Sequence, residues 1–356
     1  MDVSWPRPWL IDLLGDLQRR IREVVREDLS SQSTAFLSSV ARGGAGDVTF
    51  QIDVRPEEVV ADLLSNPPEP LLVICEGLGR RVFPDGAPDT DVQWCVIIDP
   101  LDGSREIAYG KRSAWVLSGI AAARPSPTLA DILWAMQTEV PPLGQECGVV
   151  VTAARRQGAY QQTHDLSAVL ERDRKAVAPI GGKAATRTVG EKQALRPSVA
   201  RSVRGGFAIF ADYFAGSHML IGEIADETLG RVLGPVKKGE AVVYNDQYLS
   251  SGGCMYLLAT GRYRFFADLR PTISEVGRTA GLCAHPYDLC THLIASEAGA
   301  IVTDITGGPL SYPLSTEVDC GWVGYANASI RAEMETPLSS AVRDFVARHT
   351  RNQPGR

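Results

Sequence analysis

IIDPLDGSRE, residues 97 to 106, places two aspartates three positions apart at the end of an apolar run. Along a regular strand, side chains three apart face opposite sides of the sheet. Pro100 has no amide hydrogen and fixes its own φ, so we predict that the strand ends at Asp99 and the chain turns there. Such a turn can bring Asp99 and Asp102 to one side.

The next two residues suit the start of a helix. Gly103 permits a backbone conformation that other residues rarely adopt, and Ser104 is a good N-cap for a helix over residues 105 to 110. Two carboxylates beside free amides could share divalent cations while the amides hold a phosphate. A capped turn with solvated acids is the alternative, and these residues alone leave both open.

Three other acids occupy comparable positions. Glu76 follows the apolar run LLVIC (71 to 75), and Asp53 ends TFQID, which we predict to be a short strand. If these strands are neighbours of WCVII (94 to 98), their acids emerge at one edge of the sheet, where ligand sites of α/β proteins lie. Asp288 lies at the predicted N-terminus of a helix over 288 to 298, where an acid is either a cap or a ligand.

Composition narrows the class of protein. The chain has 356 residues, 44% of them hydrophobic, which is enough for a large core in two parts. Its formal net charge of -6 argues against binding of a nucleic acid polymer. We find no secretory signal and no apolar run long enough to span a membrane. The seven cysteines lie mostly in apolar runs, as expected of reduced thiols in a cytoplasmic protein.

The pattern of apolar residues predicts a mixed α and β protein with layered packing. We expect an amphipathic helix from Leu10 to about Ser30, a mobile glycine loop at 41 to 47, and a helix that begins at Pro56. Residues 171 to 204 hold nine basic residues against three acids, which favours a solvated connection over a clamp for substrate phosphate. Short apolar runs predict further strands: WVLSGIAAA, CGVVV, GAY, FAIF, AVVY, CMYLLAT, AIVTD and GWVGYA.

The motifs, taken as an ordered set, resemble one known family. DPLDGS (99 to 104) is similar to the D-P-[ILV]-D-G-[ST] signature of the inositol monophosphatase and fructose-1,6-bisphosphatase superfamily of metal-dependent, lithium-sensitive phosphatases. VTFQID (48 to 53) and PYDLCTHLIASEAGAIVTDITGGPL (286 to 310) resemble its upstream and C-terminal elements. The segment 253 to 268 also resembles the family, and residues 161 to 240 have little that matches.

The resemblance implies a layered α-β-α-β-α sandwich. Residues 1–165 would form an N-terminal α+β part that carries most metal ligands. Residues 166–356 would form a C-terminal α/β part that supplies Asp288 and the residues that select the substrate. Family members are commonly dimers or tetramers, so a homodimer or homotetramer is expected.

The resemblance also implies a set of roles at the site. Glu76, Asp99 and the Leu101 carbonyl would hold one Mg2+, and Asp99, Asp102 and Asp288 a second. The catalytic residues would be Asp53, Ser104 and Glu76, with Asp53 and Ser104 orienting and deprotonating a water, while the amides of Gly103 and Ser104 receive the phosphate. The implied reaction is direct hydrolysis of a small phosphorylated metabolite, an inositol or sugar phosphate monoester.

One departure from the family pattern and one group of zinc-type side chains bear on which metal ions the chain would bind. Many members have two successive glutamates at the upstream ligand, whereas Gly77 follows Glu76 here. A third Mg2+ would therefore need another acid such as Asp47, for which a role in the turn is favoured. Four residues also have zinc-type side chains, but their spacing fits no usual zinc site, so we favour buried or incidental residues: Cys283, His285, Cys290 and His292.

The choice of substrate is left open by the sequence. Asp268 could bind sugar or inositol hydroxyls, and Arg270 could bind a second phosphate, but a surface ion pair is an equal alternative for both. A bisphosphate-directed enzyme, either a fructose-1,6-bisphosphatase or an adenosine 3',5'-bisphosphate nucleotidase, is thus the second hypothesis. A non-catalytic relative that binds phosphometabolites is the third.

Overall fold

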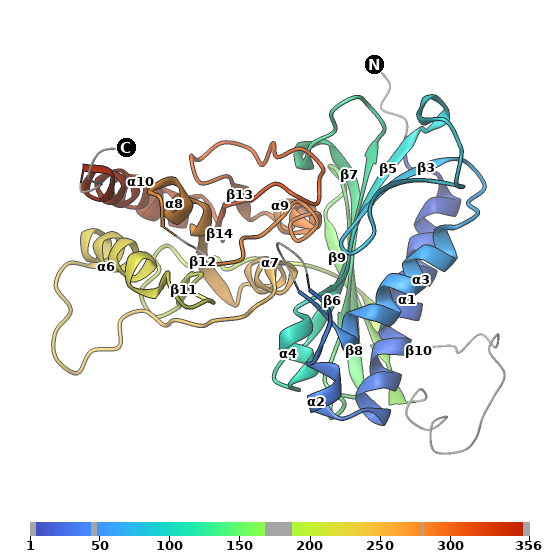
Figure 1. The fold of residues 1–356 in the computed structure, drawn as a ribbon. Helices are drawn as coiled ribbons and strands as arrows, with labels where there is room; N and C mark the ends of the chain where they lie inside the picture. The colour runs from blue at the N-terminus through green and yellow to red at the C-terminus, as the bar shows by residue number, and fades with distance from the viewer. Residues whose placement is uncertain (1–4, 44–47, 168–186, 279–280, 352–356) are drawn as a thin grey trace.

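The computed structural model describes residues 5–43, 48–167, 187–278 and 281–351 (Figure 1). Its helices are α1 (Pro8–Ser31), α2 (Thr34–Leu37), α3 (Gln51–Leu64), α4 (Ser104–Ala108), α6 (His218–Leu233), α7 (Ser251–Ala259), α8 (Arg270–Glu275), α9 (His292–Ala298) and α10 (Ala328–Arg351). The strands are β1 (Val40–Arg42), β2 (Thr49–Phe50), β3 (Leu71–Cys75), β4 (Gly79–Phe83), β5 (Trp94–Asp102), β6 (Ala114–Ala122), β7 (Ile132–Val140), β8 (Cys147–Ala154), β9 (Ala159–Asp165), β10 (Arg187–Ala194), β11 (Phe207–Phe210), β12 (Tyr263–Asp268), β13 (Ile301–Thr303) and β14 (Trp322–Tyr325).

A large sheet of eight strands organises the first half of the chain, in the order β10-β9-β8-β7-β6-β5-β3-β4. Strands β3 and β5 run parallel, with Leu71 opposite Trp94 and Cys75 opposite Ile98, and every residue of both strands is buried. A continuous apolar run satisfies both faces of such a strand, which explains why these two runs predicted strands correctly.

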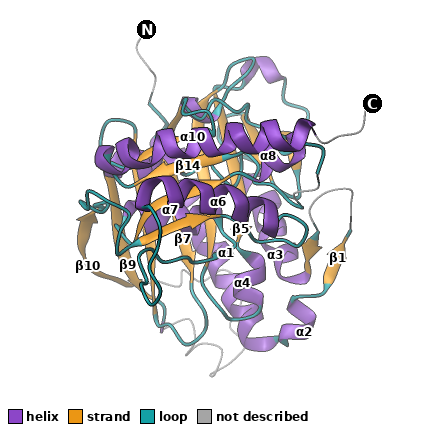
Figure 2. Ribbon diagram, turned by 90° about the vertical axis from the view of Figure 1, so that its left-hand side faces the viewer, coloured by secondary structure: helices purple, strands orange, loops and turns teal. Residues whose placement is uncertain are grey.

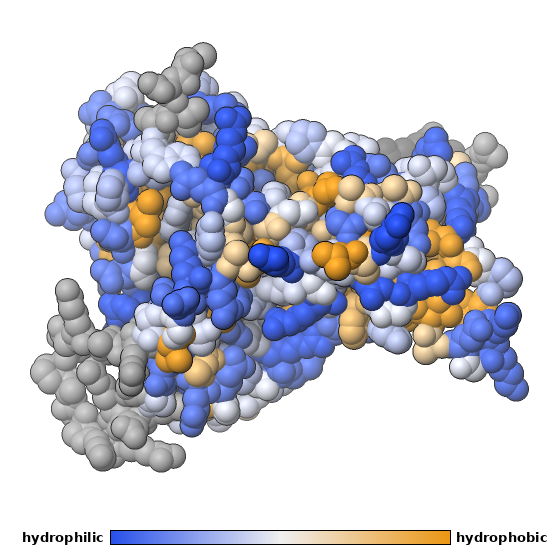
Figure 3. Space-filling model, turned by 180° about the vertical axis from the view of Figure 1, so that it is seen from behind, coloured by the Kyte–Doolittle hydropathy of each residue, from blue (hydrophilic) through white to orange (hydrophobic). Residues whose placement is uncertain are grey.

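A second sheet of four strands, in the order β11-β12-β14-β13, organises the other half. Figure 1 shows five layers: α1 and α3, the large sheet, α7 and α9, the small sheet, and finally α6, α8 and α10. Helices α6 and α10 pack side by side and cover the small sheet (Figure 2). Seen from behind, the surface is mostly hydrophilic, with separate hydrophobic patches (Figure 3). The predicted α-β-α-β-α sandwich is confirmed.

Two predicted strands are wrong. CMYLLAT lies in helix α7, which is buried on nearly all sides, so its apolar run has no helical periodicity. The signal for this helix was the N-cap: the Ser250 hydroxyl accepts a hydrogen bond from the Gly253 amide at 2.8 Å. AVVY contributes only an isolated bridge between Tyr244 and Phe207.

Helix α3 begins earlier than predicted. It starts at Gln51, so Asp53 lies in its first turn and not at the end of a strand, and Pro56 lies inside the helix. One hydrogen bond of the capping-box type explains the start, since the Phe50 amide donates to the Asp53 carboxylate at 2.8 Å. Helix α1 ends at Ser31, close to the predicted position.

The change from the first sheet to the second lies between Ala194 and Phe207, later than residue 165, because β10 pairs with β9. Part of the basic segment is therefore an edge strand, and residues 171 to 186 lie outside the described residues. All seven cysteines are free thiols, and six are buried. Among the described helices, none combines the length and the apolar character that crossing a membrane requires.

Candidate metal centre and active site

A bulge in β5 brings the two aspartates of the opening motif together. Asp99 lies opposite Leu117 and Asp102 opposite Trp115, so three steps along β5 match two steps along β6. The extra residue changes which face the later side chain occupies, so both carboxylates reach the same side. The strand thus continues through the proline, and the prediction that it ends at Asp99 is wrong.

Gly103 directly follows the bulge and is the N-cap of α4, with a φ of 89°. A Cβ at this position would lie 3.1 Å from the Ser250 Cβ, so both the backbone conformation and the close approach require glycine. The prediction that Ser104 is the N-cap of α4 is wrong, because Ser104 is the first residue of the helix. The Ser104 amide and the Gly103 amide lie at the start of the helix, where no helical carbonyl can accept a hydrogen bond from them.

Three carboxylates from both halves of the chain meet at this point. Asp99, Asp102 and Asp288 each offer an oxygen within 4.8 Å of the others, and this is the one group of potential metal ligands found among the described residues. Asp288 lies in the turn before α9, four residues before the helix and not at its start. The zinc-type residues do not form such a group, and His292 contacts the Leu129 carbonyl at 2.9 Å instead.

Backbone and hydroxyl donors hold each carboxylate in place. Asp99 accepts from the Leu101 amide at 2.9 Å, and Asp288 accepts from the His285 amide at 2.6 Å. One oxygen of Asp102, Oδ2, accepts from the Ser250 hydroxyl and the Gly252 amide, both at 2.7 Å. The first turn of α7 therefore fixes Asp102.

Gln137 on β7 joins α7, whose first turn holds Asp102, to the segment that carries Asp288. Its side-chain nitrogen donates to the Gly252 carbonyl at 2.9 Å, and its side-chain oxygen accepts from the Thr291 hydroxyl at 3.1 Å. Gln137 and Thr291 are buried. The sequence analysis did not identify β7 or Gln137, because a single glutamine in an apolar strand carries no motif.

Burial and mutual repulsion disfavour ionisation of this cluster. Burial raises the pKa of Asp99 well above its usual range, and the carboxylates of Glu76, Asp102 and Asp288 raise it further. Burial also raises the pKa of Asp102 to about 6, against the hydrogen bonds from α7 that lower it. A bound cation would reverse this balance.

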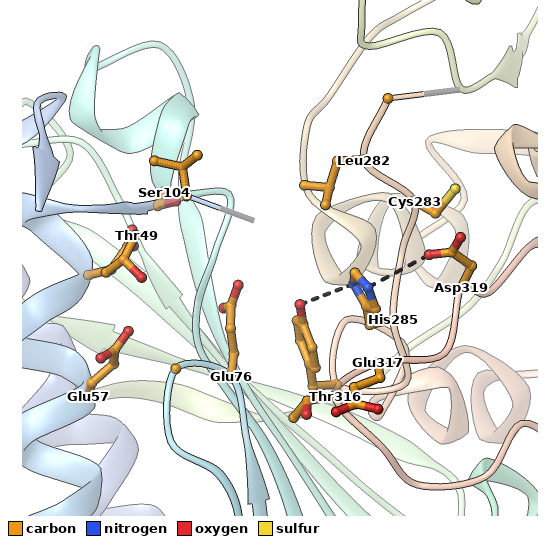
Figure 4. Close-up of a pocket in the computed structure, with 15 residues that line it drawn as sticks. Thr49, Glu57, Glu76, Ser104, Leu282, Cys283, His285, Thr316, Glu317 and Asp319 are labelled. Atoms are coloured by element: carbon orange, nitrogen blue, oxygen red, sulfur yellow. Dashed lines mark hydrogen bonds and ion pairs between the residues drawn. The ribbon is translucent and has the colours of Figure 1, made fainter. Parts of the chain in front are cut away.

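The other predicted catalytic residues line a cavity of about 580 Å³ beside the cluster. Asp53 and Ser104 lie on its wall, and Glu76 lines both this cavity and a smaller one around the three aspartates. Figure 4 shows Glu76 and Ser104 on one side of the cavity and His285 and Asp319 on the other. The His285 Nε2 and the Asp319 Oδ1 are 3.8 Å apart.

Glu57 is an acid of this cavity that the sequence analysis missed. A Cβ added at Gly77 would lie 2.1 Å from the Glu57 carboxylate oxygen, so Glu57 fills the space beside Glu76 that a side chain at 77 would take. It lies one helical turn after Asp53 and forms an ion pair with Arg42. Its position relative to Asp53 was the available signal. Asp47, the acid considered for a third metal, lies outside the described residues.

Asp268 and Arg270 form a buried ion pair with each other, with Asp268 1% and Arg270 4% exposed. The Arg270 Nε donates to Asp268 at 2.8 Å, and its Nη1 donates to the Leu282 carbonyl at 2.5 Å. Arg270 lines the smaller cavity and Asp268 does not. Their binding of substrate remains a prediction.

The arrangement of the layers defines the fold. The fold is that of the inositol monophosphatase and fructose-1,6-bisphosphatase superfamily, as the motifs predicted. Similar structures include fructose-1,6-bisphosphatase from Leishmania major in holo form, which is 15% identical with a TM-score of 0.64 and 96% coverage of both chains.

Extragenic suppressor protein SuhB from Bartonella henselae is 17% identical, with a TM-score of 0.59, and 92% of this chain matches 98% of that protein. The inositol monophosphatase of Thermotoga maritima is 16% identical, with a TM-score of 0.56 and coverages of 94% and 98%. No family model and no curated protein matches the sequence. At these identities the likeness concerns the fold.

Proposed function

We propose that this chain is a Mg2+-dependent hydrolase of phosphate monoesters that acts on an inositol or sugar phosphate. The observation that carries the proposal is the convergence of Asp99, Asp102 and Asp288 within 4.8 Å. Buried acids at this spacing repel one another, and a divalent cation compensates their charge.

The donor set fits Mg2+, which prefers oxygen ligands. Glu76, Asp99 and the Leu101 carbonyl would hold one ion, and Asp99, Asp102 and Asp288 a second. Such ions lower the pKa of water and stabilise the charge of the attacking and leaving oxygens.

The chain's own residues would then position the reactants. The amides of Gly103 and Ser104 would donate to the phosphate at the start of α4, while the Ser104 hydroxyl and the Asp53 carboxylate orient the attacking water and take its proton. The Asp53 carboxylate should be held rigidly, because the Phe50 amide donates a hydrogen bond to it. The cavity of about 580 Å³ has room for a polyol or sugar beside the phosphate.

A bisphosphate substrate is the second candidate, since Arg270 lines the smaller cavity beside the aspartates. Its guanidinium already donates to Asp268 and Leu282, so a second phosphate would have to compete with these partners. A non-catalytic, phosphometabolite-binding relative remains the candidate of another class.

A substrate panel tests the proposal. Phosphate release from inositol, sugar and nucleotide phosphates should require Mg2+ and fall when Li+ is added, with the fastest turnover on a polyol or sugar monophosphate. Preference for a bisphosphate would favour the second candidate. If no phosphate is released from any member of the panel, the enzyme proposal fails. Binding of a panel member without turnover would then favour the non-catalytic relative that binds phosphometabolites.

Acid should weaken the stabilisation that Mg2+ provides. The folded pKa of Asp102, about 6, lies above the usual value, so ionisation destabilises the metal-free fold as the pH rises through 6. Mg2+ needs the ionised form, so protons compete with it below that pH. The rise in melting temperature on adding Mg2+ should therefore be clearly larger at pH 8 than at pH 5.5. An equal rise at both values would contradict this assignment of Asp102.

A further inference from the structure

A further cavity, of about 370 Å³, lies between α1 and the outer strands of the large sheet. It shares no lining residue with the two cavities at the carboxylates. Figure 1 shows α1 on the face of the sheet opposite α7 and α9. The cavity is therefore separate from the proposed active site.

The register of the sheet brings polar side chains onto this face. Met136, Thr152 and Tyr160 lie opposite one another on β7, β8 and β9, and Thr138 lies opposite Val150 one step further. Residues two apart on a strand share a face, so His164 and Gln162 lie on the same side as Tyr160. These side chains face the helix that carries Arg22.

Arg22 has a buried guanidinium without an acceptor. The residue is 2% exposed, and no described group accepts a hydrogen bond from its Nε or Nη1. Two other atoms at the cavity are also buried without a partner: Thr138 Oγ1 and His164 Nδ1. A buried cation without a partner costs several kcal/mol, and unpaired buried polar atoms add to this cost, so four such atoms around one cavity point to a ligand.

The cavity is positively charged. Arg19, Arg22 and Lys192 line it, and none of its described lining residues is acidic. The Lys192 ammonium lies 4.5 Å from the centre of the Tyr160 ring. Burial lowers the pKa of Arg22 to about 10, which still leaves the group charged at neutral pH.

The two acids that act on Arg22 have other partners. Glu23 accepts from Arg19 at 2.7 Å. Glu139 accepts from the Ser113 hydroxyl at 2.7 Å and from the Val149 amide at 3.0 Å. Neither carboxylate lines the cavity, so the charge of Arg22 is left for a ligand.

We propose that this cavity binds a small phosphate-type oxyanion through the Arg22 guanidinium, with Thr138, His164 and Lys192 as further donors. A guanidinium presents paired N–H groups that match two oxygens of a phosphate, and hydrogen bonds to such a charged pair are strong. The phosphate is either free or part of a small metabolite, since the volume exceeds what the ion alone needs.

The test uses the full chain in EDTA without Mg2+, because uncompensated carboxylates then repel phosphate from the proposed active site. Inorganic phosphate is titrated by calorimetry and by thermal unfolding, at an ionic strength held constant with chloride. The wild type should bind phosphate and melt at a higher temperature. Arg22→Met should weaken binding at least about tenfold and should melt no lower than the wild type without phosphate.

Arg20→Met is the matched control, since Arg20 lies on the same helix as Arg22 but pairs with Glu23 and does not line the cavity. It should bind phosphate as the wild type does. If Arg22→Met does not fold, Lys192→Met decides, because the exposed Lys192 side chain is not needed for the core. The proposal is overturned if the wild type does not respond to phosphate, or if the variant that folds binds it with wild-type affinity.

Discussion

Asp102→Asn should lower turnover of the preferred phosphate ester by about a thousandfold or more and leave the fold intact, because the proposed metal ligand loses its charge. The amide oxygen of asparagine can still accept from Ser250 and Gly252, whose hydrogen bonds hold this position. Since burial already raises the pKa of Asp102, a neutral side chain should cost the metal-free protein little stability. Steady-state kinetics and thermal unfolding measure the two effects.

The matched control is Asp91→Asn, at an exposed acid outside both cavities. It should keep wild-type turnover. Asp102→Asn should in addition reduce the stabilisation by Mg2+, which distinguishes loss of a ligand from loss of substrate binding. Unchanged turnover in Asp102→Asn would contradict the assignment of Asp102 as a ligand.

Gln137→Leu should lower the free energy of unfolding by about 2–4 kcal/mol, because it removes the side-chain hydrogen-bond partner of two buried groups. These are the carbonyl of Gly252 and the hydroxyl of Thr291, which belong to the segments around Asp102 and Asp288. Movement of either segment should also weaken Mg2+ binding. Urea unfolding gives the first quantity, and calorimetry with Mg2+ gives the second.

Gln157→Leu provides the comparison, since Gln157 is exposed in the turn between β8 and β9. It should change the free energy of unfolding by less than about 0.5 kcal/mol. A wild-type affinity for Mg2+ in a destabilised Gln137→Leu would mean that Gln137 supports the fold without positioning the acids.

The sequence predicted those parts of the fold whose pattern has one physical explanation. The apolar runs at β3 and β5 are strands because both of their faces are covered. The run CMYLLAT has the same character, but α7 is covered on all sides, so the pattern alone could not separate helix from strand. Pro100 suggested a turn, and only the pairing of β5 with β6 reveals a bulge.

For the site, the family resemblance was more informative than local patterns. It grouped Asp99, Asp102 and Asp288 from distant segments, and the structure brings these three together. Gln137 and Arg22 could not be identified in this way, because the position of each depends on long-range packing, and the one signal for Glu57 was its place one helical turn after Asp53. Glu57 occupies the space beside Gly77. Gln137 bonds to two segments of the other half, and Arg22 lies at the outer face of the sheet.

The carboxylate cluster joins residues that the ribosome makes at very different times. Asp99 and Asp102 belong to β5 of the large sheet, which is synthesised first, whereas Asp288 belongs to the turn before α9, which is synthesised later. During synthesis the early pair lacks its third partner until most of the chain has emerged. High affinity for a divalent cation should consequently appear only when both halves have docked. Binding of the cation would then stabilise the docked halves late in folding and would report completed assembly.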